Sequence, residues 1–254
     1  MPQIHAFEAM GTVVSLTLVD ELGTDTQHAA ITAAEDVFAR LNERFSLYRD
    51  DSEISRIAAG TLTLADSSDE MRHAYAEALA WRERTNGIFT PHRPDGVIDL
   101  SGTIKAVAIA EAAEALRAHS YANFSVNAGG DVSVSGHEDL AVRRGWTTGI
   151  VDPANRHAML TAVVLDAELP CIATSGSAER GEHIWRRPES DVSFVQASIL
   201  APDMVMADVL ATTVIAGGMA AFELASQTYP VAVFAIDSQG EFYANPVFEE
   251  RLAQ

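Results

Sequence analysis

Strand-like and helix-like segments alternate irregularly along this chain of 254 residues, and no repeat or long polar linker separates them. Stretches rich in β-branched residues predict strands over 10–19, 145–152, 160–166, 170–174 and 192–200. Apolar residues at three- and four-residue spacing predict helices from Ile31 to Phe45 and over 68–85, 204–217 and 218–228. This alternation predicts a mixed α+β fold in which residues 1–254 form one integrated domain.

The charge of the chain limits its partners. Its 17 basic and 36 acidic side chains give a net charge of −19 and an isoelectric point near 4.6. Such a surface repels phosphate backbones and anionic lipids, so we expect neither nucleic-acid binding nor membrane binding. The N-terminal stretch has no basic region and no long apolar run, so a cytoplasmic protein is expected. The single cysteine, Cys171, excludes a disulfide within the chain.

A first candidate site lies between Asp99 and Lys105. An acid ends an expected apolar strand, a Ser-Gly turn follows the acid, and a helix is expected to begin near Lys105. The start of a helix presents free N–H groups and the positive end of its dipole, and a lysine there adds a full charge. This pattern is typical of a phosphate or ribose site. A capping turn with a surface lysine fits the same residues.

A second candidate is Asn127–Asp131, where Gly129 and Gly130 separate two expected strands. Paired glycines let the backbone approach a ligand closely, although they are also common in hairpin turns. A third candidate follows the strand at 170–174. There Thr174, Ser175 and Gly176 precede His183, a residue suited to proton transfer near neutral pH. A polar surface hairpin remains open as the alternative.

The fourth candidate lies in the strongly apolar helical segment around Asp208 and Thr212. These residues are four positions apart and therefore share one helix face. A carboxylate and a hydroxyl side by side offer two hard oxygen ligands to Mg²⁺, and an ionised acid among apolar residues needs a partner. A capping acid near the helix start, with a threonine bonded to its own backbone, fits the spacing as well.

Seven segments in this order resemble the ApbE family, the FAD:protein FMN transferases. They are Met10–Thr12, the YRDDSEIS stretch from Tyr48, Gly87–Pro91, Val97–Lys105, Asn127–Asp131, Ala173–Ile184 and Ala207–Thr213. The resemblance implies a T-fold-related α+β fold with antiparallel sheets and two intimately packed lobes. It also implies that FAD and one or two Mg²⁺ ions occupy a cleft.

The resemblance assigns roles residue by residue. Asp99 and Lys105 are expected to contact FAD, and the Gly102 carbonyl is expected to bind the metal together with Asp208 and Thr212. His183 is expected near the reacting phosphates as a catalytic group. The remaining cofactor-binding residues that we expect are Met10, Tyr48, Ile88, Phe89, Thr90, Gly129, Gly130, Thr174, Ser175 and Gly176.

The implied reaction is attack on FAD by a Thr or Ser hydroxyl of an unidentified acceptor protein, with release of AMP. Attack by water would instead make the protein a Mg²⁺-dependent FAD pyrophosphatase. A third alternative is a protein that binds FAD without catalysis. The chain departs from the family pattern at Ala106 and Ala110, where Gly and Asp are usual, and at Thr90, where Asp is frequent. The family's HHI segment is Glu182-His183-Ile184 here.

Overall fold

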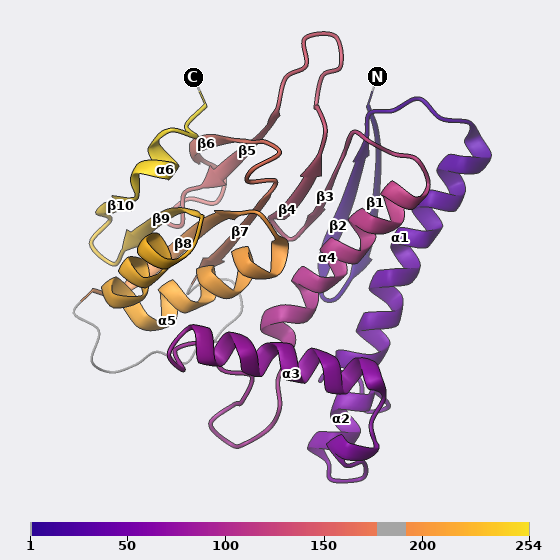
Figure 1. The fold of residues 1–254 in the computed structure, drawn as a ribbon, viewed down its shortest axis with the longest axis vertical. Helices are drawn as coiled ribbons and strands as arrows, with labels where there is room; N and C mark the ends of the chain where they lie inside the picture. The colour runs from indigo at the N-terminus through magenta and orange to yellow at the C-terminus, as the bar shows by residue number, and fades with distance from the viewer. Residues whose placement is uncertain (1, 177–191, 254) are drawn as a thin grey trace.

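A single antiparallel sheet of eight strands organises the protein (Figure 1). This computed structural model describes residues 2–176 and 192–253. Across the sheet the strands are β1 (Gln3–Ala9), β2 (Thr12–Leu18), β3 (Phe124–Ala128), β4 (Asp131–Ser135), β7 (Cys171–Gly176), β8 (Phe194–Ala201), β9 (Ala232–Asp237) and β10 (Phe242–Ala244). Every neighbouring pair is antiparallel, which confirms the expected mixed α+β class.

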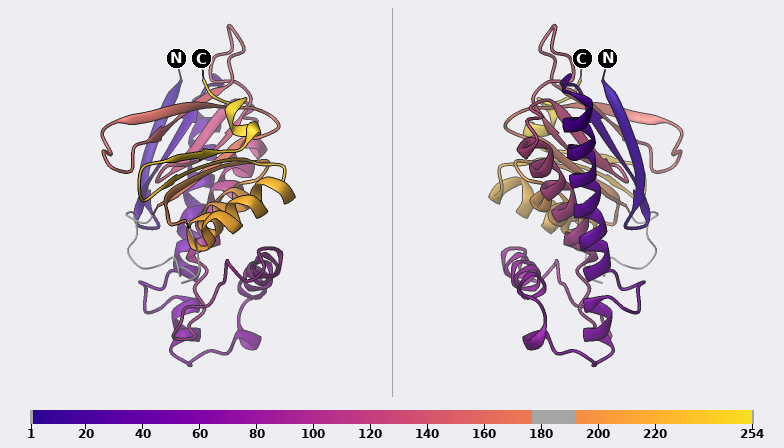
Figure 2. Two further views of the ribbon diagram at one scale, coloured as in Figure 1. Left: turned by 90° about the vertical axis from the view of Figure 1, so that its left-hand side faces the viewer. Right: turned by 90° about the vertical axis from the view of Figure 1, so that its right-hand side faces the viewer.

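Three long helices cover one face of this sheet (Figures 1 and 2). They are α1 (Thr24–Phe45), α4 (Ser101–Ala118) and α5 (Met204–Thr228). The apolar positions of α1 at Ala34, Phe38, Leu41 and Phe45 are all buried, as their spacing predicts. The short elements α2 (Glu53–Ala58) and η1 (Leu64–Asp66) lead into α3 (Asp69–Arg84), which lies across the lower ends of α1 and α4 in Figure 1.

A second, smaller core lies on the other face of the sheet. There the ribbon of β5 (Trp146–Val151) and β6 (Met159–Leu165) packs together with α6 (Pro246–Glu249). Strand residues alternate between the two cores, because successive side chains of a strand point to opposite faces. In β9, Val233 and Ala235 contribute to the helix-covered core, whereas Phe234 and Ile236 contribute to the smaller one.

Helix α5 is interrupted at Gly218, whose φ of 60° and ψ of −143° are not helical. The two helices expected over 204–217 and 218–228 meet between residues 217 and 218, which agrees with this break. Among the described residues α5 is the one helix long and apolar enough to match a membrane span, and 67% of its most apolar window is buried within the protein. Its hydropathy is therefore accounted for by packing against the sheet and α4.

Two local predictions differ from the structure in part. The strand expected over 10–19 begins at Thr12, because Met10 and Gly11 adopt positive φ values of 50° and 72° and form a turn after β1. The apolar segment before Asp99 forms only an isolated bridge between His92 and Ile98, and α4 begins at Ser101 instead of near Lys105. The turn residues 101–104 therefore belong to the helix itself.

The C-terminal segment is tied to β6 by Arg251, which forms ion pairs with Asp166 and Glu168. Burial raises the pKa of Asp166, but two effects outweigh burial. The backbone N–H groups of Leu169 and Glu168 donate to its carboxylate, and the Arg251 guanidinium lies beside it. The resulting pKa lies below the usual value for aspartate.

Candidate functional site

The start of α4 is held by the acid that precedes it. Leu100, at the N-cap position, offers no side-chain acceptor, and Asp99 Oδ1 instead accepts the N–H of Ser101 at 2.9 Å. The N–H of Asp99 donates to the carbonyl of Pro91 at 2.8 Å. Asp99 is therefore fixed at the positive end of the α4 dipole. This position suits both an acid that binds a ligand and an acid that caps the helix.

Gly102 and Phe89 are packed together at this end of α4. A Cβ atom on Gly102 would lie 3.3 Å from a ring carbon of Phe89, and the Phe89 ring is buried. Ile88 makes a similar approach to Gly217 in α5, where an added Cβ would lie 2.9 Å away. Thr90 Oγ1 accepts the N–H of His92 at 3.2 Å. The segment 88–90 thus packs between α4 and α5, and its role in lining a flavin stays a prediction.

Lys105 forms a buried ion pair with Asp131, the first residue of β4. Only 12% of the lysine side chain and 2% of the aspartate side chain are exposed. The other carboxylate oxygen, Asp131 Oδ1, accepts the N–H of Thr174 at 3.0 Å. Asp131 thereby joins α4, β4 and β7, a role that the sequence analysis did not assign to it. A signal was present, because this acid directly follows two glycines and begins a segment expected to form a strand.

Gly129 and Gly130 form the two-residue turn between β3 and β4, with φ values of 64° and 97°. The hairpin interpretation of this segment is therefore confirmed. The Gly130 N–H donates to Asn127 Oδ1 at 3.0 Å. A Cβ atom on Gly129 would lie 2.6 Å from Thr12 Oγ1, so this turn fits closely against the start of β2. The Met10 turn is consequently beside the Gly129 turn.

The end of β7 brings hydroxyl groups to α5. The strand continues through Gly176, two residues beyond its expected end. Thr174 Oγ1 lies 2.8 Å from Ser198 Oγ of β8, and Ser175 Oγ lies 3.2 Å from Thr212 Oγ1. A continuous series of contacts therefore runs from Lys105 through Asp131 and the β7 end to Thr212. His183, the expected catalytic residue, lies outside the described residues.

Asp208 and Thr212 occupy one face of α5 beside this series. Asp208 is 6% exposed, and Thr212 is partly buried with its hydroxyl toward Ser175. Within residues 2–176 and 192–253 no group of three acidic, histidine or cysteine side chains is arranged to hold a metal ion. A cation here would therefore depend on one carboxylate, a hydroxyl, a backbone carbonyl and non-protein oxygens, a combination that suits Mg²⁺.

Two expected flavin contacts are less constrained. Met10 lies in the β1–β2 turn with a φ of 50° and packs partly against the main core. Tyr48 follows α1 and is 89% exposed, so its ring is available to solvent or to a ligand. The structure does not bring the Tyr48 side chain into the contact series from Lys105 to Thr212.

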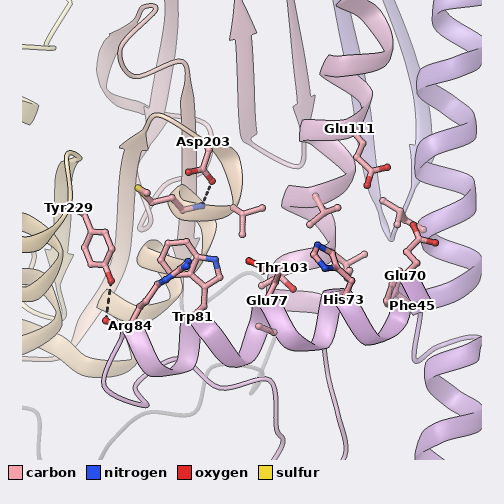
Figure 3. Close-up of a pocket in the computed structure, with 17 residues that line it drawn as sticks. Phe45, Glu70, His73, Glu77, Trp81, Arg84, Thr103, Glu111, Asp203 and Tyr229 are labelled. Carbon is pink, nitrogen blue, oxygen red and sulfur yellow. Dashed lines mark hydrogen bonds between the residues drawn. The ribbon is translucent and has the colours of Figure 1, made fainter. Parts of the chain in front are cut away.

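A pocket of about 550 Å³ lies between α3 and the long helices (Figure 3). Its α4 lining comes from Thr103, Ile104, Val107 and Glu111. Each residue of an α-helix is rotated by about 100° from the one before, so these side chains face away from Lys105. Among the described residues, none of the site residues expected from the sequence lines this pocket, and in that part of the chain it is separate from the candidate site.

The fold and the site together define a class of protein. It is an α+β protein whose antiparallel sheet is covered on one face by helices. A paired lysine, a buried acid and two hydroxyls meet where α4, β4, β7 and α5 adjoin. The sequence profile of the ApbE family matches residues 10–94 and 92–235. The chain therefore belongs to the ApbE family.

Solved structures support the same fold. The ApbE protein of Thermotoga maritima superposes with a TM-score of 0.83 at 18% identity, over 100% of both chains. The flavin transferase ApbE of Vibrio cholerae gives 0.76 at 20% identity, over 99% of this chain and 100% of that one. The flavinyl transferase ApbE of Pseudomonas stutzeri, in its apo form, gives 0.79 at 16% identity, over 100% of this chain and 98% of that one. None of the curated proteins matches the chain.

Proposed function

We propose that this protein is a Mg²⁺-dependent FAD:protein FMN transferase. It joins the FMN half of FAD through a phosphoester bond to a Thr or Ser of a cytoplasmic acceptor protein and releases AMP. The observation that carries the proposal is the family match over residues 10–94 and 92–235, which includes every segment of the candidate site. The contacts that link α4, β4, β7 and α5 add physical support, because they bring the matching segments together.

The residues present fit a magnesium ion. Asp208, Thr212 and the carbonyl of Gly102 would hold it, and all three supply the hard oxygen ligands that Mg²⁺ prefers. A helical carbonyl such as that of Gly102 has a second lone pair available beyond its helix hydrogen bond. When bound, the ion supplies positive charge that offsets the diphosphate and the charge that develops as the P–O–P link breaks.

The charges of the site support a requirement for a metal ion. Among the described residues of the candidate site, Asp99, Asp131 and Asp208 carry three carboxylates against the single ammonium of Lys105. The ammonium is itself bound to Asp131. A diphosphate entering this site therefore meets excess negative charge, and we expect FAD to bind tightly only with a divalent cation.

The transfer step is a displacement at the FMN-side phosphorus of FAD. The acceptor hydroxyl oxygen forms a new P–O bond, the bond to the AMP phosphate breaks, and AMP leaves with the electron pair. The hydroxyl proton passes to a base, a role that we propose for His183. Lys105 would orient the diphosphate, since a lysine ammonium favours phosphate, and Asp99 would accept a hydrogen bond from a hydroxyl or N–H group of the nucleotide.

The proposal is tested with FAD, Mg²⁺ and a library of threonine-bearing peptides, beside a matched library in which alanine replaces threonine. We expect AMP release and a mass gain of one FMN only with the threonine library, and we expect EDTA to abolish both. AMP release that is equal without any peptide would identify a pyrophosphatase instead. FAD binding without AMP release under any condition would leave a non-catalytic binding protein and contradict the proposal.

A further inference from the structure

The pocket beside α3 is formed because that helix crosses the long helices instead of lying along them (Figure 3). It encloses about 550 Å³, within the range of about 300–1,000 Å³ that small-molecule sites occupy. It faces the side of α4 opposite to Lys105, so its occupant would not compete with a ligand of the candidate site.

The walls of this pocket are largely apolar. Phe45 of α1, Ala74 of α3, and Ile104 and Val107 of α4 face it from three helices. At one end the Arg84 guanidinium lies 5.0 Å from the centre of the Trp81 ring, which closes that end with a cation–π contact. An apolar hollow of this size with polar groups at its rim is more typical of a ligand site than of ordinary surface.

The charged groups at the rim differ in their availability. Glu70 and Glu111 both form ion pairs with Arg40. Asp203 Oδ1 accepts the Met206 N–H at 2.8 Å and so caps α5. Glu77 lies on the exposed middle of α3, and it makes no hydrogen bond or ion pair with residues of the described ranges. The lining also holds His73 and Arg84, and the Arg84 guanidinium lies over the Trp81 ring at the end of the pocket. At the centre of the pocket the charge left to meet a ligand is the Glu77 carboxylate.

We propose that this pocket binds a small organic monocation, a protonated amine attached to an apolar body. The ammonium lies at Glu77, and the body occupies the hollow between Phe45, Ile104 and Val107. The complementarity is direct, because a carboxylate attracts the cation while the apolar walls exclude water from the hydrocarbon. Anionic ligands are disfavoured by Glu77 and by the net charge of −19.

The test uses three probes with the same phenylbutyl body: phenylbutylamine, phenylbutanol and phenylbutyrate. Binding to the full-length protein is measured by isothermal titration calorimetry at low salt. We expect the amine to bind with one-to-one stoichiometry. The alcohol should bind about fivefold more weakly, as the loss of one partly exposed charge contact implies, and the carboxylate should not bind measurably.

Two variants and one control separate charge recognition from shape. Glu77→Gln should weaken the amine about fivefold and leave the alcohol unchanged, whereas Glu83→Gln, on an exposed position of the same helix outside the pocket, should change neither. Ala74→Leu fills the hollow with a helix-favouring residue and should abolish binding of both probes. Circular dichroism confirms that each variant is folded. Equal affinity for all three probes, no binding of any probe, or an amine preference that survives Glu77→Gln would each overturn the proposal.

Discussion

Replacing Asp131 by asparagine tests whether the buried ion pair with Lys105 organises the site. The substitution keeps the size of the side chain, and the amide oxygen can still accept the Thr174 N–H that Asp131 Oδ1 accepts at 3.0 Å. Only the negative charge is lost. We therefore expect the main effect to act through the Lys105 ammonium, which is 12% exposed and loses the Asp131 carboxylate.

The magnitude follows from burial. Removing one partner of a buried ion pair costs about 3–5 kcal/mol, because the remaining charge stays desolvated. The lysine keeps 12% of its side chain exposed, so it has a route to solvent, and the lower end of that range applies, about 3 kcal/mol. A protein of this length loses about 2–4 °C of melting temperature per kcal/mol, which gives a decrease of about 6–12 °C.

The assay is thermal unfolding followed by circular dichroism, with two comparisons. The double variant Asp131→Asn with Lys105→Met removes both charges. It should lose less stability than the two single variants lose together. Glu114→Gln disrupts an exposed pair with Arg117 on the same helix, where the side chains are 74% and 41% exposed, and it should cost less than about 1 kcal/mol. An Asp131→Asn variant that melts as the Glu114→Gln variant does would refute the reasoning.

Four further outcomes are expected. Asp208→Asn should raise the Mg²⁺ concentration needed for half-maximal AMP release by at least about tenfold with the fold retained by circular dichroism, since it removes the only carboxylate of the proposed donor set. Gly129→Ala should lower the melting temperature, because its φ of 64° is strained for alanine and the new Cβ would lie 2.6 Å from Thr12 Oγ1. Burial raises the pKa of Cys171 to about 11, so a thiol reagent at pH 8 should label it only after the addition of denaturant. Because the pKa of Asp166 is lowered in the folded protein, its carboxylate stabilises the fold at pH values above the usual aspartate pKa of about 3.9. This contribution is lost as the pH falls below that value. Asp166→Asn should therefore reduce the loss of stability measured between about pH 5 and pH 2.

Helices and central strands could be predicted from the sequence because their apolar spacing matches a buried face. The buried positions of α1 and the break of α5 at Gly218 are both visible in the residue pattern. The first strand, QIHAFEA, could not be predicted in this way, because it is an edge strand whose side chains remain largely exposed. Strand β1 is held by its antiparallel register with β2, which is a tertiary feature.

The candidate site was predicted as four separate segments, and the sequence does not show how they meet. Asp131 illustrates the limit, because its importance comes from Lys105 on α4 and Thr174 on β7, which are 26 positions earlier and 43 positions later in the chain. Alternation within β4 groups Asp131 with Ser133 and Ser135, opposite to Val132 and Val134, so the sequence indicates neither the burial of this acid nor its partners. Such pairs require the strand order β4–β7 and the packing of α4 on the sheet.

The Lys105–Asp131 pair also changes what the lysine can contribute. A free lysine at the start of a helix would attract a diphosphate by itself, as the sequence pattern suggests. A lysine bound to a buried carboxylate adds little net charge and acts mainly as a fixed hydrogen-bond donor. Under the proposed function, the attraction for a diphosphate would then come from a cation held near Asp208. Nucleotide affinity would depend on that metal, so the dissociation constant for FAD should respond to Mg²⁺ far more strongly than to the loss of the lysine charge.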